Sequence, residues 1–283
     1  MKFLSFEHNG QSSFGTLTGD RKGVVDLGRR LEGQVSSLRA LLALPDYLHL
    51  AQRYADSADY SLDDITFLPV IPDPEQIFCV GLNYGEHVAE TNRETTEQPV
   101  IFMRVPASQT GHAQPLMRPR ESTSFDYEGE IAVIIGKPGR RISEAEAWDH
   151  IAGYACYNDG SVRDWQRHTG QWGPGKNFWQ TGGFGPWMVS ADEILPDAEM
   201  TLTTRVNGQE VQRATTRQLI HSIPAQIAYL STFTPLKVGD VIVTGTPGGV
   251  GAKRNPPLFL KPGDTVEVTV DRIGTLTNTI ADD

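Results

Sequence analysis

The sequence is poor in cysteine and has no long hydrophobic run. Its 283 residues include two cysteines, Cys79 and Cys156, each inside an apolar stretch. This excludes a small secreted scaffold held by disulfide bonds and favours a reducing compartment. No stretch approaches the roughly eighteen apolar residues of a membrane span, and the first residues, MKFLSFEHNGQSS, are acidic and polar where a secretory signal is apolar. We therefore expect a soluble, cytoplasmic protein with no membrane partner.

Positive charge is also scarce. The chain has 25 Lys and Arg against 35 Asp and Glu, for a net charge of −10. Such a surface repels polyanions, so we expect no nucleic-acid partner. The G-x-S-x-G, H-E-x-x-H, G-x-G-x-x-G and C-x-x-C motifs are missing, which removes the commonest hydrolase, zinc protease and dinucleotide-binding classes. The run from Thr244 to Lys253 is no phosphate loop either, because Ala252 stands where that pattern requires glycine.

What the sequence does contain indicates a β-rich α/β protein in two parts. Twenty-eight glycines and 18 prolines separate short β-rich runs. Residues 1–70 predict a small α+β domain, with strands at 2–7 and 13–19 and a helical segment at 35–56 interrupted by Pro45. Three prolines between residues 69 and 74 lack backbone donors and resist regular structure, so we place a boundary there. Residues 71–283 would form the catalytic domain.

Several elements are predicted in this second part. Within residues 78–84 a buried strand is expected to end at Gly81, and further strands are expected at 99–105, at 126–136 and near the end of the chain. Helices are expected at 86–95, 143–158 and 221–233. The helix at 143–158 rests on Ser143 and Glu146, which have the spacing of a capping box. Asn207-Gly208, between two alternating runs, predicts a hairpin.

Glu128 and Glu130 are candidate metal ligands. They stand two apart in a predicted strand, so both carboxylates project from the same face. Adjacent carboxylates repel, and a hard divalent cation keeps both ionised. Asp159, at the end of a later apolar segment, is a candidate third ligand. The alternative for such a pair is an exposed strand face.

His87 and Glu90 are candidates for proton transfer. Three residues apart on the predicted helix 86–95, they lie on one side and can hydrogen-bond. The carboxylate would fix the imidazole tautomer and make it a general base. The polar composition suggests a mobile lid over residues 87–97. The alternative is a chance pair on a solvated helix.

Arg163, Gln166 and Lys176 follow Asp159 closely and indicate an anionic substrate, because guanidinium and ammonium groups hold carboxylates. Surface ion pairs are the alternative. Four tryptophans between residues 165 and 187 could line a pocket, although core packing is the usual role.

Six segments, in order, resemble the fumarylacetoacetate hydrolase family: VGLNYGEHVAE, FDYEGEIAVIIGK, YNDGSVRDWQ, GPGKNF, GFGPWMV and VTGTPGGVG. The resemblance implies a mixed β-sandwich roll behind a small N-terminal domain, usually as a homodimer. It implies Mg²⁺ or Mn²⁺, with Ca²⁺ as an alternative. It also implies a role for each candidate: Glu128, Glu130 and Asp159 as metal ligands, His87 and Glu90 as a water-activating dyad on a lid, Lys176 with Arg163 and Gln166 for the keto acid, and Thr246 for its carboxylate.

The chain departs from the family pattern at two positions. Trp179 replaces an aspartate of many relatives, which predicts a bulkier, less charged pocket wall. Arg104 replaces a lysine, which need not matter if its role is structural.

The resemblance implies cleavage of a carbon–carbon bond in a 2,4-dioxo acid, such as an acylpyruvate from aromatic catabolism, to pyruvate and a carboxylic acid. Relatives also decarboxylate, isomerise or hydrate such acids, and a decarboxylase of an oxaloacetate-like acid is the second hypothesis. The dyad favours hydrolysis, since it would activate the water. A metal-dependent binding protein without turnover is a third reading.

Overall fold

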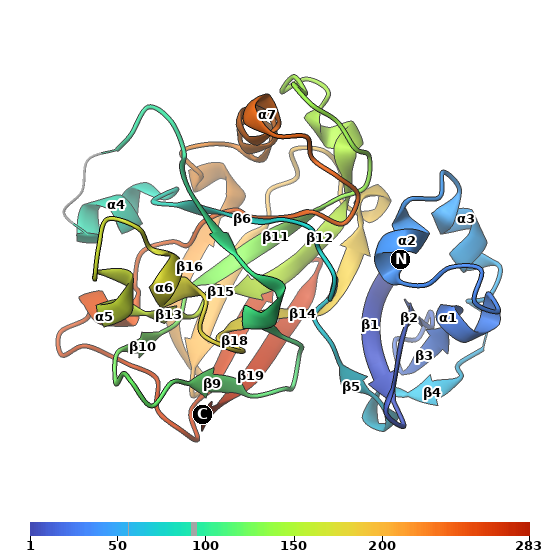
Figure 1. Cartoon of the computed structure of the whole chain (residues 1–283), viewed down its shortest axis with the longest axis horizontal. Coiled ribbons are helices and arrows are strands. Elements are labelled where there is room, and N and C mark those ends of the chain that lie inside the picture. Colours follow the sequence, from blue (N-terminus) through green and yellow to red (C-terminus); the bar gives the residue numbers. More distant parts are fainter. Residues whose placement is uncertain (56, 92–94) are drawn as a thin grey trace.

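The computed structural model describes residues 1–55, 57–91 and 95–283. Strands dominate this part of the chain and form a large mixed sheet, a smaller sheet and a short two-stranded ladder (Figure 1). No helix among the described residues is long and apolar enough to cross a membrane. The predicted β-rich fold with few helices is confirmed.

The large sheet runs through the whole molecule. Its strands, in spatial order, are β4 (Tyr60–Ser61), β3 (Gly23–Asp26), β2 (Gln11–Leu17), β1 (Lys2–His8), β14 (Gly182–Ser190), β12 (Ile151–Asn158), β11 (Gly129–Ile135), β17 (Val241–Val243), β6 (Ile77–Gly81) and β7 (Val100–Arg104), with β5 (Thr66–Phe67) beside β1 and β8 (Gln109–Thr110) beside β14. Because β7 ends this order, it is an edge strand.

The smaller sheet packs across the large one to form the sandwich. It consists of β16 (Gln209–Thr215), β15 (Thr201–Val206), β18 (Thr265–Val270), β19 (Gly274–Asp282) and β9 (Leu116–Arg118). Its strands contact β11, β12 and β14, and buried side chains such as Val133 and Val268 fill the interface. β10 (Phe125–Asp126) and β13 (Ser161–Val162) form the two-stranded ladder.

The helices are short and lie around the sheets. They are α1 (Leu27–Arg30), α2 (Leu38–Leu42), α3 (Tyr47–Gln52), α4 (Gly85–Thr91), α5 (Arg163–Gln166), α6 (Gly173–Lys176) and α7 (Ile223–Phe233), with single 3₁₀ turns η1 (Leu62–Asp64), η2 (Pro106–Ser108), η3 (Ala147–His150), η4 (Ala191–Glu193), η5 (Thr216–Gln218) and η6 (Gly251–Lys253). Figure 1 shows α1 to α3 at one side of the molecule and α4 to α6 at the other. The site described below lies among the second group.

The N-terminal region shares its sheet and its core with the rest of the chain. β1 pairs with β14, so the sheet continues across the predicted boundary at residue 70. Phe3 and Leu38 belong to the same buried cluster as Ile134 and Phe184. Folding the first seventy residues therefore covers apolar surface of the larger region. The division into two domains stays a prediction.

The predicted helix at 143–158 is wrong. Residues Ile151–Asn158 form β12, buried along its whole length between β11 and β14. Such a strand is apolar on both faces, and a continuous apolar run has no period that separates a strand from a buried helix. The hydroxyl of Ser143 does donate to a carboxylate oxygen of Glu146 at 2.6 Å, but the turn it closes leads only into η3.

Candidate active site

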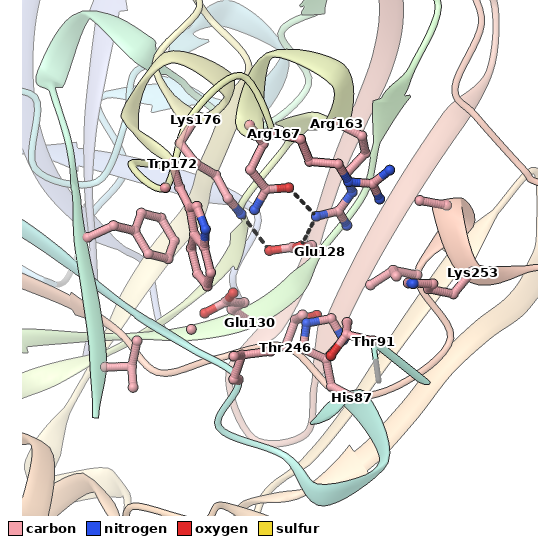
Figure 2. A pocket seen from close by; sticks show the side chains of 18 of the residues that line it. His87, Thr91, Glu128, Glu130, Arg163, Arg167, Trp172, Lys176, Thr246 and Lys253 are labelled. Carbon is pink, nitrogen blue, oxygen red and sulfur yellow. Dashed lines mark hydrogen bonds and ion pairs between the residues drawn. The ribbon is translucent and has the colours of Figure 1, made fainter. Parts of the chain in front are cut away.

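A cavity of about 420 Å³ opens among α4, α5 and α6. Figure 2 shows the side chains that line it. The predicted site residues in its lining are His87, Glu128, Glu130, Arg163, Gln166, Lys176 and Thr246. The remaining two are outside the lining but contact it: Glu90 contacts His87, and Asp159 contacts Lys176. The folded chain therefore brings all the predicted site residues to one place.

The three acids meet because of the register of two strands. β11 pairs with β12 so that Gly129 faces Asn158, and the amide of Asp159 donates to the carbonyl of Glu128 at 2.8 Å. Glu128 itself lies just before β11 rather than inside a strand, which corrects the predicted bounds of 126–136. One carboxylate oxygen from each of Glu128, Glu130 and Asp159 lies within 4.8 Å of the others, and all three side chains are buried.

Cationic side chains surround two of these acids. Nζ of Lys176 lies 2.7 Å from Glu128 and 2.5 Å from Asp159. Nη1 of Arg163 lies 2.6 Å from Glu128, and Nη1 of Arg104 lies 2.5 Å from Asp159. Buried charges are tolerated when they are paired in this way.

Arg104 is a member of the site that sequence reasoning left as a structural substitution. Its side chain is fully buried and also donates to Gly160 and Thr181. The available signal was a charged residue in an apolar strand, PVIFMRV, because a buried arginine requires an anionic partner.

Glu130 lies in a different environment from Glu128. Burial raises the pKa of Glu130 well above its ordinary value, and the nearby carboxylates of Asp159 and Glu128 raise it further. Burial acts in the same direction on Glu128, but the cations of Arg163 and Lys176 outweigh it and lower its pKa. No ion pair joins Glu130 to a cationic side chain in the part of the chain that the structure describes; its oxygen accepts from the amide of Gly245 at 2.5 Å.

This donor set fits a hard divalent cation. Mg²⁺ and Mn²⁺ prefer carboxylate oxygens, and the three acids supply only such ligands from one buried cluster. Nζ of Lys176 already contacts two of the acids, so the cluster accommodates a positive charge beside it. Glu128, Glu130 and Asp159 would hold the ion.

His87 and Glu90 form the expected pair on α4. Nδ1 of His87 lies 2.7 Å from Oε1 of Glu90, and the other oxygen of Glu90 accepts from the amide of Gly249 at 2.9 Å. These contacts fix the imidazole ring through Nδ1, so Nε2 is the ring nitrogen that a proton transfer would use. The helix ends at Thr91, and the predicted lid over 87–97 includes residues 92–94, which lie outside the described residues.

The glycine-rich turn after β17 holds one side of the cavity. Gly245 has a φ of +113°, and a Cβ there would lie 2.6 Å from the Cβ of Asn83, so only glycine fits. Next to it, the hydroxyl of Thr246 donates to the carbonyl of Gly129 at 3.0 Å and accepts from Nε2 of Gln212 at 2.8 Å. The turn is thereby tied to the start of β11, where the acids stand.

Two aromatic rings form an apolar wall in the lining of the cavity. Trp172 packs against Phe102 with 5.4 Å between ring centroids, and Nζ of Lys176 lies 4.9 Å from the Phe102 ring. Trp172 is therefore one of the tryptophans that line a pocket. The prediction that Trp179 makes a bulkier wall is wrong, because the chain turns after α6 and leaves Trp179 53% exposed, outside the cavity lining.

Known proteins resemble this chain in sequence and in fold. The family model "Fumarylacetoacetate (FAA) hydrolase C-terminal" matches residues 76–281. Oxaloacetate tautomerase fahd2, mitochondrial, of Xenopus laevis is 36% identical over 99% of this chain and 90% of its own. The solved fumarylacetoacetate hydrolase of Exiguobacterium antarcticum is 30% identical, with a TM-score of 0.84 over 100% of both chains. Maleylpyruvate hydrolase from Sphingobium sp. SYK-6, solved with manganese (II) ion and pyruvate, is 26% identical, with a TM-score of 0.81 over 100% of this chain and 99% of that one.

Proposed function

Because the chain belongs to the fumarylacetoacetate hydrolase family, we propose that it is a divalent-metal-dependent keto–enol tautomerase of a 2-oxo acid of the oxaloacetate type. One observation carries this proposal: the His87–Glu90 pair and the buried acids line or adjoin one cavity. The Xenopus relative, which aligns over nearly the whole chain, is named for this reaction.

The residues of the cavity divide the work of a proton transfer. With Glu90 accepting from Nδ1–H, Nε2 of His87 is the base that takes a proton from C3 of the keto acid and returns it to the oxygen on C2. A bound Mg²⁺ or Mn²⁺ would polarise the 2-carbonyl and so acidify the neighbouring C–H. Lys176 and Arg163 place positive charge beside the acids and stabilise negative charge that develops on the substrate oxygen.

The test is an ultraviolet assay of the enol of oxaloacetate with purified, metal-stripped protein, with and without Mn²⁺. We expect metal-dependent interconversion of enol and keto forms without release of CO₂ or pyruvate. Release of CO₂ and pyruvate would indicate the decarboxylase hypothesis instead. No acceleration with Mn²⁺ would contradict the tautomerase proposal.

Hydrolysis of a 2,4-dioxo acid is the second candidate. The same dyad could activate water for attack on the 4-carbonyl, and the Sphingobium maleylpyruvate hydrolase was solved with manganese and pyruvate. Formation of pyruvate and a carboxylic acid from an acylpyruvate, at a rate exceeding that on oxaloacetate, would favour this candidate over tautomerisation.

We also propose that the protein is a homodimer. The edge strand β7 and the residue after it expose apolar side chains, with Met103 46% and Val105 49% exposed. Apolar side chains on an unpaired edge are typical of a surface that another chain covers. The cytoplasmic location expected from the sequence stays a prediction.

A further inference from the structure

Two basic side chains at the cavity have no partner in the part of the chain that the structure describes. Arg167 and Lys253 line the cavity and are exposed. Their side chains make no hydrogen bond or ion pair within residues 1–55, 57–91 and 95–283. Elsewhere, exposed arginines such as Arg213 and Arg217 pair with neighbouring glutamates. Arg140 and Lys261, away from the cavity, also have no such partner among the described residues, so what sets Arg167 and Lys253 apart is their position beside one cavity in a chain of net charge −10.

A third basic group supports the same reading from inside the cavity. Arg163 is 5% exposed and uses Nε for Asp126 and Nη1 for Glu128. Its Nη2 is buried and has no hydrogen-bond partner among the described residues. A buried guanidinium donor without an acceptor is costly, and an anionic ligand would satisfy it.

The basic groups are distributed unevenly around the cavity. Figure 2 shows Trp172 at one side and Lys253 at the other, with Glu128 and Glu130 between them. His87 lies on the Lys253 side. A substrate held at the acids therefore has an apolar wall in one direction and a cation beyond the base in the other.

We propose that Arg167 and Lys253 form a subsite for a second carboxylate, so that the enzyme selects dicarboxylic 2-oxo acids over monocarboxylic ones. This inference rests on the proposed function, since it assumes that the 2-oxo acid end is held at the acids. Arg163, deeper in the cavity, supplies its free donor to the first carboxylate, and the two rim cations hold the distal one. Their unpaired charge also draws dianions towards a molecule that otherwise repels them.

The experiment compares two ligands that differ by one carboxylate. L-Malate differs from L-lactate only in a second carboxylate, which replaces one methyl hydrogen. Neither is a 2-oxo acid, so the site cannot tautomerise them. Their dissociation constants are measured by calorimetry on the Mn²⁺-supplied protein, for the wild type and for Arg167→Met with Lys253→Met. The control carries Arg140→Met and Lys261→Met, which remove two exposed charges outside this cavity. The KM for oxaloacetate is measured on the same proteins.

We expect the double variant to bind malate about tenfold more weakly and to raise the KM for oxaloacetate similarly, while lactate binding changes less than about twofold. The control should behave as the wild type. Equal weakening of malate and lactate, equal loss in the control, or no loss at all would overturn the subsite.

The calorimetry keeps the subsite separate from the proposed reaction. If the wild type binds malate more tightly than lactate, the double variant loses this preference and the wild type does not tautomerise oxaloacetate, the subsite is supported and the tautomerase is rejected. If the wild type tautomerises oxaloacetate but the double variant binds malate and lactate as the wild type does, the tautomerase is supported and the subsite is rejected.

Discussion

Two glutamates of this site, Glu128 and Glu130, have neighbours that shift their pKa values in opposite directions. Glu128 contacts two cations, whereas Glu130 contacts a backbone amide and faces two carboxylates. The pKa of Glu128 is therefore lowered and that of Glu130 raised, although both are buried. Arg163 and Lys176 are the cations that lower the pKa of Glu128, and Lys176 also joins Glu128 to Asp159.

Removing Lys176 should destabilise the metal-free protein. Lys176→Met leaves buried carboxylates without one of their partners, which costs about 3–5 kcal/mol of unfolding free energy. Urea unfolding of the metal-free protein measures this, and Mn²⁺ should restore part of the loss by replacing the positive charge. Lys261→Met, on the exposed surface, is the control. An unchanged midpoint for Lys176→Met would contradict the pairing.

Metal affinity should rise with pH. Because burial and two carboxylates raise the pKa of Glu130, this group holds a proton in the metal-free protein at pH values where an ordinary glutamate has lost it. Metal binding releases that proton, so binding weakens as pH falls below the raised pKa and levels off above it. Titration of Mn²⁺ by calorimetry from about pH 5.5 to 8 measures the trend. The variant Glu130→Gln should bind more weakly and lose most of the slope; a flat wild-type profile would rule this out.

At the level of elements, sequence reasoning succeeded where a signal is local. Asn207 and Gly208 both have positive φ and close the hairpin between β15 and β16, as the dipeptide predicts. The two-residue spacing likewise singled out Glu128 and Glu130 as a pair, but it left an exposed strand face as the alternative, and only the folded chain brings them together with Asp159. β12 could not be recognised in the same way, because its side chains are buried on both faces. Arg104 was also missed as a site residue, since its contact with Asp159 joins residues far apart in the sequence.

The turn after β17 should not tolerate a side chain at Gly245. Gly245→Ala adds a Cβ at positive φ and against Asn83, which should cost about 2 kcal/mol or more and move the amide that Glu130 accepts from. Unfolding free energy and Mn²⁺ affinity should both fall. Gly10→Ala separates strain from crowding, because Gly10 also has positive φ but would meet nothing within 4 Å. Equal effects at both positions would contradict the contact with Asn83.

At the scale of the molecule, an acidic protein carries a strongly basic lining around one buried acidic cluster. The net charge of −10 correctly indicated an acidic protein, but composition cannot indicate where the basic residues gather. The N-terminal region is also more closely integrated than its composition suggested, because β1 extends the large sheet through β14. Strand pairing between residues 2 and 189 leaves no local pattern in the sequence.

The edge of this sheet should be covered in solution. We expect light scattering after size-exclusion chromatography to give twice the chain mass of 31.1 kDa. Met103→Glu with Val105→Glu should give a monomer, because charge on an edge strand opposes association. Leu195→Glu, at a residue 72% exposed elsewhere, should remain dimeric. A monomeric wild type would end the homodimer proposal.

The most direct test of proton transfer by His87 is exchange of deuterium from solvent into C3 of oxaloacetate, followed by proton NMR on the Mn²⁺-supplied protein. The wild type should exceed the spontaneous rate, and His87→Ala should lose about 10²- to 10⁴-fold of the enzymatic part while binding Mn²⁺ normally. Glu86→Gln, an exposed change on the same helix, should retain exchange. Exchange at the wild-type rate in His87→Ala would show that another group is the base and would contradict the account.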